Sequence, residues 1–179
     1  MKIELRNVSY NERLSEDSHC FSADLFADGK KIASCSDGGH GGMTRISPYK
    51  GCEEELRQIE EYAKSLPPVI DQHFKLEMDL ELLIGQLMND YLFENKVLKK
   101  YQNRCVVLGS DKTNPMLRYW YFSGTKKKIP ITEMLQNDEG KKLLAEVIKE
   151  ALSNNQTIYN TNIPEEVIKS IELELKQCE

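Results

Sequence analysis

The dipeptide Asp28-Gly29 constrains the fold of this chain more than any other feature of the sequence. It separates two runs of strand-forming residues, 20–27 and 30–35, and Asp-Gly suits the positive φ angles of a type I′ turn. A β-hairpin with a two-residue turn is therefore predicted here. Closing the turn at this point predicts the pairs Phe26 with Lys31, Leu25 with Ile32, Asp24 with Ala33, Ala23 with Ser34 and Cys20 with Asp37.

The first half of the chain is expected to change from β to helical structure after a β-rich region at 1–50. Ile3, Leu5 and Val8 alternate as in a strand, and 43–51 suits a short strand that turns at Pro48. In the helical region 52–100, apolar residues recur at helical spacing. The expected helices there cover 52–66, where Pro67-Pro68 ends the helix, and 75–98, where Gly85 is expected to allow a close contact.

The second half is expected to return to strands at 104–122 and then to a mixed helical and β part at 131–179. The strands fall at 104–108 and 117–122. The expected elements of the last part are a helix at 133–136 capped by Thr132, a helix at 141–152, a short strand at 157–159 and a terminal helix beginning at Pro164.

This order of elements favours an α+β fold, in which an N-terminal antiparallel hairpin or sheet packs with central and C-terminal helices. A length of 179 residues is typical of a single domain, so one domain over 1–179 is expected. A domain of this size needs no disulfide or metal for stability. The apolar stripe of the terminal helix is compatible with packing inside the domain or against a second copy, so a homo-oligomer remains open.

Charge and hydropathy point to a cytoplasmic chain. No apolar signal segment follows Met1, and the longest hydrophobic stretch, 80–92, is interrupted by polar residues and is far shorter than the ~20 residues of a membrane span. A net charge of −5 predicts weak attraction to nucleic acid, so neither membrane nor nucleic acid is expected as a partner. The five cysteines include no Cys-x-x-Cys pair and are expected to be reduced thiols.

The glycine-rich loop over 36–42 is the main candidate site. Backbone N–H groups of such a turn can form a nest for an anion such as phosphate, and Thr44 and Arg45 add a hydroxyl and a guanidinium. No phosphate-loop motif is present, and the alternative is a structural loop that reverses the chain at a sheet edge. The expected ligand-binding residues are Gly38, Gly39, His40, Gly41, Gly42, Thr44 and Arg45.

A second candidate combines His19, Cys20, Asp37 and His40, which the predicted hairpin register brings into one neighbourhood. A Cys/His nucleophile or a small metal site is conceivable there. No third zinc ligand is assured, however, and we expect neither a metal nor a cofactor. His73 follows a proline stop, where a cap or surface role is expected.

Aromatic residues at 119–122 precede Lys126, Lys127 and Lys128, which resembles a stacking platform beside a basic patch. Strand alternation places Tyr119 and Tyr121 on one face of the strand, and Trp120 and Phe122 on the other. At least one pair is then expected in the core, with the lysines in a solvated turn. Core packing is the favoured interpretation, and nucleic-acid binding ranks third among the functional hypotheses.

The segments from Ser15 to Leu25, from Asp28 to Lys31, from Gly38 to Gly42 and from Thr157 to Pro164 together resemble an uncharacterised family associated with bacterial genomes, prophages and phages. The resemblance implies a small accessory protein of a mobile element, of the kind that blocks or sequesters part of a host defence system.

The function predicted from the sequence is a non-enzymatic accessory binding protein acting in counter-defence. Its partner would be a nucleotide-like anionic ligand or a host defence protein, bound near the glycine-rich loop. The alternative is a small hydrolase or transferase that uses Cys20 with His19 or His40.

Overall fold

The computed structural model describes residues 1–70, 75–110, 117–123 and 128–176. The fold is α+β, as the sequence predicts. The chain divides into two compact units, Met1–Asn89 and Asp90–Glu179, where one domain over 1–179 was expected. We call them unit 1 and unit 2. Within the described ranges, no helix combines the length and the apolar character needed to cross a bilayer.

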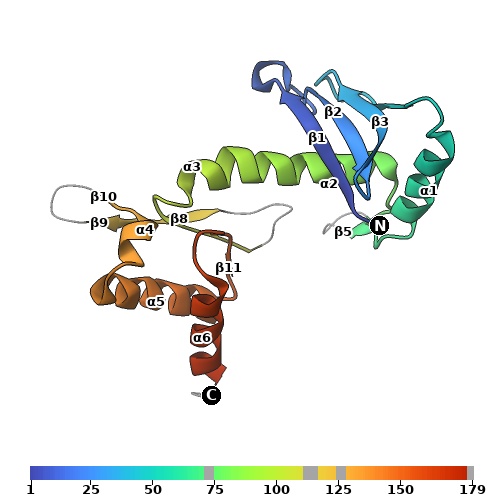
Figure 1. Cartoon of the computed structure of the whole chain (residues 1–179). Helices are drawn as coiled ribbons and strands as arrows, with labels where there is room; N and C mark the ends of the chain where they lie inside the picture. The colour runs from blue at the N-terminus through green and yellow to red at the C-terminus, as the bar shows by residue number, and fades with distance from the viewer. Residues whose placement is uncertain (71–74, 111–116, 124–127, 177–179) are drawn as a thin grey trace. The chain divides into compact units, whose positions relative to one another are not determined.

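Unit 1 contains a four-stranded antiparallel sheet in sequential order, and Figure 1 shows its first three strands side by side. The strands are β1 (Ile3–Tyr10), β2 (Phe21–Ala27), β3 (Lys30–Asp37) and β4 (Arg45–Pro48). Alternate residues of β2, namely Phe21, Ala23 and Leu25, are buried, as expected for one face of a strand. Helices α1 (Glu53–Lys64) and α2 (Leu80–Leu92) add the buried residues Leu56, Ile59, Ala63, Leu80, Leu83, Ile84 and Met88.

The predicted hairpin is present, with φ angles of 46° at Asp28 and 84° at Gly29. Its register was predicted correctly only next to the turn, where Phe26 faces Lys31. A bulge beyond this pair shifts the register by one residue, because Ile32 has no opposite partner. The observed pairs are therefore Leu25 with Ala33, Asp24 with Ser34, Ala23 with Cys35 and Phe21 with Asp37.

The outer face of this sheet carries a polar network centred on Asp24. Asn7 Nδ2 donates to Asp24 Oδ2 (2.7 Å), the Tyr49 hydroxyl donates to Asp24 Oδ1 (2.6 Å), and the Lys31 ammonium lies 3.0 Å from the carboxylate. Asn7, at φ 54°, lies where the β1 register shifts. The hydrogen bonds from Asn7, Tyr49 and Lys31 lower the pKa of Asp24 from 3.8 to about 2.

Helix α2 begins at Leu80 rather than in the region of residue 75 that periodicity suggested. Asp79 caps it by accepting the N–H of Leu82 (2.8 Å), while Lys75–Leu76 forms strand β6 against β5 (Val69–Ile70). Beyond α2 a π-helical stretch, Phe93–Leu98, leads into α3 (Lys99–Tyr101). Gly85 was expected to permit a close contact, but no atom lies within 4 Å of a Cβ built there.

Unit 2 contains a sheet in the order β11 (Thr157–Ile158), β7 (Val106–Gly109) and β8 (Arg118–Trp120). A short pair, β9 (Phe122–Ser123) with β10 (Lys128–Ile129), precedes α4 (Ile131–Met134). Thr132 does not cap α4, whose first residue follows Pro130. Asn137 caps α5 (Asp138–Ser153) instead, and Pro164 directly precedes α6 (Glu165–Lys176). The apolar stripe of α5 is buried as predicted: Leu144, Val147, Ile148 and Ala151.

A single buried amide, that of Asn160, joins distant segments of unit 2. Its Oδ1 accepts the N–H of Val107 (2.6 Å), and its Nδ2 donates to the carbonyls of Gln102 (2.7 Å) and Cys105 (2.9 Å). These groups lie where α3 leads into β7, more than fifty residues earlier in the sequence. Asn160 therefore satisfies backbone groups that would otherwise be buried without partners.

Four of the five cysteines fall among the described residues, and all four are free: Cys20, Cys35, Cys52 and Cys105. Burial raises the pKa of Cys35 to about 12, so its thiol stays protonated and unreactive at neutral pH. Cys178 lies outside the described residues, as does His73.

The network around Asp24 predicts a pH-dependent stability for unit 1. A carboxyl whose folded pKa is below its ordinary value stabilises the fold above that ordinary value, and the stabilisation is lost as pH falls from about 4 to 2. The free energy of unfolding can be measured by urea titrations followed by the amide NMR signals of unit 1. The difference in this free energy between wild type and Asp24→Asn should shrink between about pH 4 and 2, by no more than about 2 kcal/mol. A difference independent of pH would contradict this explanation.

Replacing Asn160 by alanine should destabilise unit 2 by about 3 kcal/mol, because it removes the partner of two buried backbone groups and of one part-buried carbonyl. Trp120 is the only tryptophan, so its fluorescence during urea unfolding reports on unit 2. Thr161→Ala is the matched control, since the Thr161 hydroxyl makes one exposed hydrogen bond, to the Gln102 side chain. Equal losses in the two variants would argue against the role given to Asn160.

Candidate functional site

The glycine-rich loop connects β3 to β4 and is bound to the segment that precedes β2. Gly39 is buried, at φ 88°, and its carbonyl accepts the N–H groups of Glu16 (2.9 Å), Asp17 (3.0 Å) and Ser18 (3.4 Å). Gly41, at φ 74°, donates its N–H to the Ser18 hydroxyl. The loop therefore reverses the chain next to the edge strand β4, as its structural interpretation expected.

The same loop does not present the open nest that an anion would need. The Gly39 N–H donates to Asp37 Oδ1 (2.7 Å), and the Gly41 N–H is held by Ser18. The backbone N–H of Thr44 donates to Glu81 Oε1 (2.7 Å). Two carboxylates therefore already occupy N–H groups that were candidates for phosphate.

The remaining predicted ligand residues do not converge on one point. Gly38, His40 and Gly42 are exposed, and the His40 Nδ1 lies 3.2 Å from Glu16 Oε2. Arg45 is exposed on β4, where it pairs with Ser36. Of the predicted set, only Thr44 lines the hollow described next.

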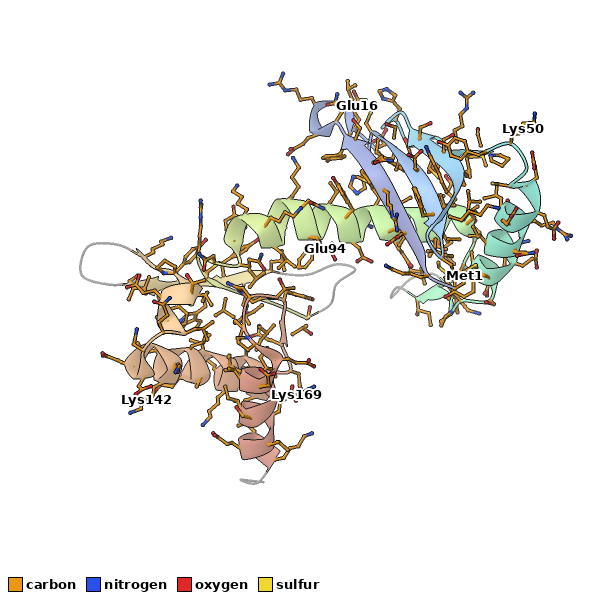
Figure 2. The ribbon with its side chains drawn as sticks, viewed as in Figure 1. Met1, Glu16, Lys50, Glu94, Lys142 and Lys169 are labelled. Atoms are coloured by element: carbon orange, nitrogen blue, oxygen red, sulfur yellow. The ribbon has the colours of Figure 1, made fainter. Side chains whose placement is uncertain are left out.

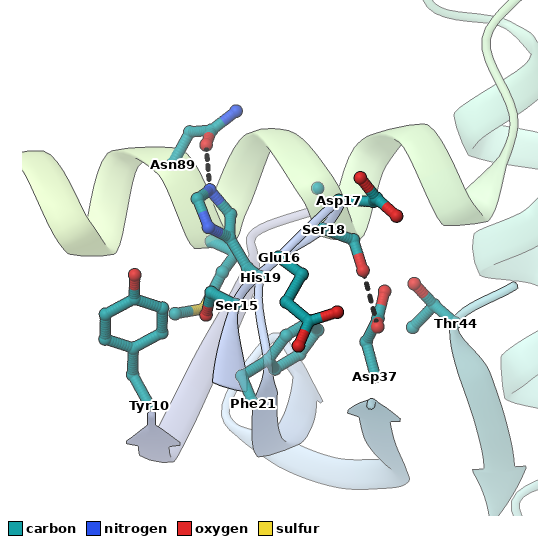
Figure 3. A pocket seen from close by; sticks show the side chains of 12 residues that line it. Tyr10, Ser15, Glu16, Asp17, Ser18, His19, Phe21, Asp37, Thr44 and Asn89 are labelled. Atoms are coloured by element: carbon teal, nitrogen blue, oxygen red, sulfur yellow. Dashed lines mark hydrogen bonds between the residues drawn. The ribbon is translucent and has the colours of Figure 1, made fainter. Parts of the chain in front are cut away.

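A hollow of about 450 Å³ lies beside the loop, between the tip of the sheet and α2 (Figure 3). Figure 2 shows Glu16 at the end of the sheet opposite Met1. Phe21 and Met88, which are 7% and 0% exposed, form the apolar floor of the hollow. Its remaining lining residues are Tyr10, Ser15, Glu16, Asp17, Ser18, His19, Asp37, Thr44, Gly85 and Asn89. We call this hollow, with its floor and rim, the acidic hollow.

The charges around the acidic hollow favour a cation. Glu16, Asp17 and Asp37 contribute carboxylates, while none of the lining residues is Lys or Arg. Asp37 is held in place because its Oδ1 also accepts the Ser18 hydroxyl (2.8 Å), as Figure 3 shows. An anionic ligand would meet like charge here, whereas a cationic group would gain from it.

The histidines and Cys20 do not form a nucleophile and base. His19 Nε2 lies 2.8 Å from Asn89 Oδ1, and its ring packs edge-on against Tyr10. Cys20 lies next to Gly39, and its backbone N–H is held by the Ser15 hydroxyl (2.9 Å). The contacts described for the two imidazole rings thus lead away from the thiol, although a nucleophile and its base need hydrogen-bond reach. Within the described ranges, no three metal-ligating side chains cluster.

The sequence indicated the location of the hollow but missed most of its walls. Gly85, Met88 and Asn89 come from α2, about seventy residues after His19, and belong to an ordinary helical pattern. The consecutive acids Glu16 and Asp17, close to His19 in the sequence, were the one local signal for the acidic rim.

Gly39→Ala should disrupt the loop rather than test ligand binding alone. A Cβ at this position would lie 1.9 Å from the Leu14 carbonyl oxygen and 2.8 Å from Cys20 Cβ, at a positive φ. We expect a loss of about 3 kcal/mol or more in the unfolding free energy of unit 1. Gly42→Ala is the control because its Cβ would meet nothing within 4 Å. Urea titration followed by the unit 1 amide signals compares them, and equal stabilities would contradict the structural role.

Comparisons of the chain with models of protein families, with curated proteins and with solved structures give no match. No activity or residue role is therefore transferred from a relative. The link to phages and mobile elements remains a prediction, and function has to be inferred from this chain's own residues.

Proposed function

We propose that unit 1 is a non-enzymatic protein-binding module whose acidic hollow receives a lysine or arginine side chain of a partner protein. The observation that supports this most directly is the combination of an apolar floor with an acidic rim. Phe21 and Met88 form the floor, and Glu16, Asp17 and Asp37 supply the charge.

A long basic side chain matches both parts of the hollow. Its aliphatic stem is apolar and its head is cationic, so the stem can cover Phe21 and Met88 while the head meets the carboxylates. Glu16 and Asp17 are exposed, and the contact of the Glu16 carboxylate with His40 Nδ1 (3.2 Å) joins two solvated side chains, so both acids can adjust to the head group. Arginine would add bidentate pairing with a carboxylate.

A host protein is the partner class that this proposal retains from the sequence-based hypotheses. The family resemblance would make the chain an accessory protein that blocks such a host protein in counter-defence. A nucleotide-like ligand is disfavoured because its phosphates would face the three carboxylates of the rim.

Titration with Nα-acetyl-arginine N-methylamide tests the hollow without a known partner. In ¹⁵N-labelled full chain, we expect saturable shifts of the Ser18, His19 and Asn89 amide signals, with a Kd on the order of millimolar. The norleucine analogue, which lacks the charge, and ADP, which is anionic, should produce no saturable shifts there. Shifts of equal size with ADP would overturn the assignment of a cation site.

Two kinds of variant locate this binding. Glu16→Gln with Asp17→Asn should weaken it by about 5-fold, through loss of two partly solvated ion pairs. Glu53→Gln with Glu54→Gln changes the net charge equally on α1 and should leave it unaltered. Gly85→Leu should block the hollow, since a side chain added at this position has open space to extend into. Equal weakening by the α1 control would show that only net charge matters.

A further inference from the structure

Basic residues are concentrated in one segment of unit 2. From Lys99 to Thr132 the sequence has eight lysines and arginines and one acidic residue, Asp111, although the whole chain carries a net charge of −5. Those that fall among the described residues are all exposed: Lys99, Lys100, Arg104, Arg118 and Lys128. Lys112, Lys126, Lys127 and Asp111 lie outside the described residues. The charge of this segment is therefore opposite to that of the acidic hollow.

Tyrosines lie among these cations. Tyr119 on β8 and Tyr121 just after it fall on the same side of the strand by alternation, and the Tyr119 ring lies 4.9 Å from that of Tyr101. We call Tyr101, Tyr119 and Tyr121 the tyrosine face. Core packing was expected for this strand, and it holds for Phe122, which is buried, and for Tyr121, which packs against a buried cluster; Tyr119 and Trp120, in contrast, are 37% and 43% exposed.

Cations flank the tyrosine face on two sides. The Lys128 ammonium lies 3.5 Å from the Tyr121 ring centroid, and the Lys100 ammonium lies 5.0 Å from that of Tyr101. Arg104 and Lys128 also line a shallow hollow of about 380 Å³ with Asn103, Ile129 and Pro130. No carboxylate lines this hollow, so its charge suits a phosphate group.

The tyrosine face lies next to a strand edge that is unpaired among the described residues. In the order β11-β7-β8, β8 is the outer strand of the sheet formed by the described residues. Its partner β7 is completely buried, which holds β8 against a rigid support. Tyr119 itself is 37% exposed among the described residues and so offers ring surface to a partner.

We propose that the tyrosine face and its flanking cations Lys100, Arg104 and Lys128 bind single-stranded nucleic acid. Bases would stack on Tyr119 and its neighbours, and phosphates would lie against the cations. Aromatic rings interleaved with basic side chains are the combination that binds single strands without regard to sequence. An acidic protein segment would use the cations but gain little from the rings.

Fluorescence anisotropy of labelled oligo(dT), about 12 nucleotides long, tests this with the full chain. We expect binding at low salt and a fall in affinity as salt rises, because phosphate contacts release counterions. Lys100→Gln with Lys128→Gln should reduce the slope of log affinity against log salt by about 1.4. Lys141→Gln with Lys142→Gln, on α5, makes the same change in charge and should preserve the slope.

Adjacent residues of β8 supply the matched test for stacking. Tyr119→Leu should weaken binding by about 10-fold, whereas Tyr119→Phe, which keeps the ring, should bind as wild type. Trp120→Leu, on the opposite side of the strand and similarly exposed, should also bind as wild type. Absence of binding at low salt would overturn the proposal, as would equal losses for Tyr119→Leu and Trp120→Leu. Equally tight binding of polyglutamate would assign the surface to acidic protein segments instead.

Discussion

The carbonyl of Gly39 accepts hydrogen bonds from three consecutive N–H groups, and the shape of the acidic hollow depends on this single acceptor. It fixes the segment from Glu16 to Ser18 against the β3–β4 loop, so that two carboxylates stand at the rim of the acidic hollow. Only glycine fits, because the Leu14 carbonyl and Cys20 occupy the place of a side chain. The glycine that suggested an anion nest thus serves to position acids.

Unit 2 is held by hydrogen bonds of a side chain rather than of a backbone carbonyl. The buried amide of Asn160 pairs backbone groups at both ends of the connection between α3 and β7, and β7 in turn supports the exposed strand β8. In each unit, one polar group with several hydrogen bonds fixes the backbone: the Gly39 carbonyl in unit 1 and the Asn160 amide in unit 2. Charged residues lie on the exposed segments that these groups support. Such fixed edges hold a surface in shape without the partner present.

Local signals were sufficient for much of the fold but not for the surfaces. Asp28-Gly29, the apolar stripe of α5 and the strand at 157–158 were predictable because the responsible residues are neighbours in sequence. The bulge at Ile32 lies in a strand, β3, that pairs with both β2 and β4, and the periodicity of one segment contains no information about such pairing. The walls of the acidic hollow likewise combine β2 with Gly85 and Asn89 of α2. Net charge also does not reveal that opposite charges are segregated: acids line the hollow, and cations concentrate between residues 99 and 128.

The two units also differ in the sequence separation between the residues that pair within each of them. The sheet of unit 1 closes through consecutive strands within its first 48 residues, so each pairing encloses a short loop. In the central strand β7, the N–H of Val107 finds its partner only in Asn160, which lies 53 residues later in the chain. Closing that longer loop costs more chain entropy before any contact is gained. During synthesis the first sheet can therefore form early, while unit 2 stays open until β11 emerges, so the edge of β7 that β11 later covers is temporarily exposed to association with other chains.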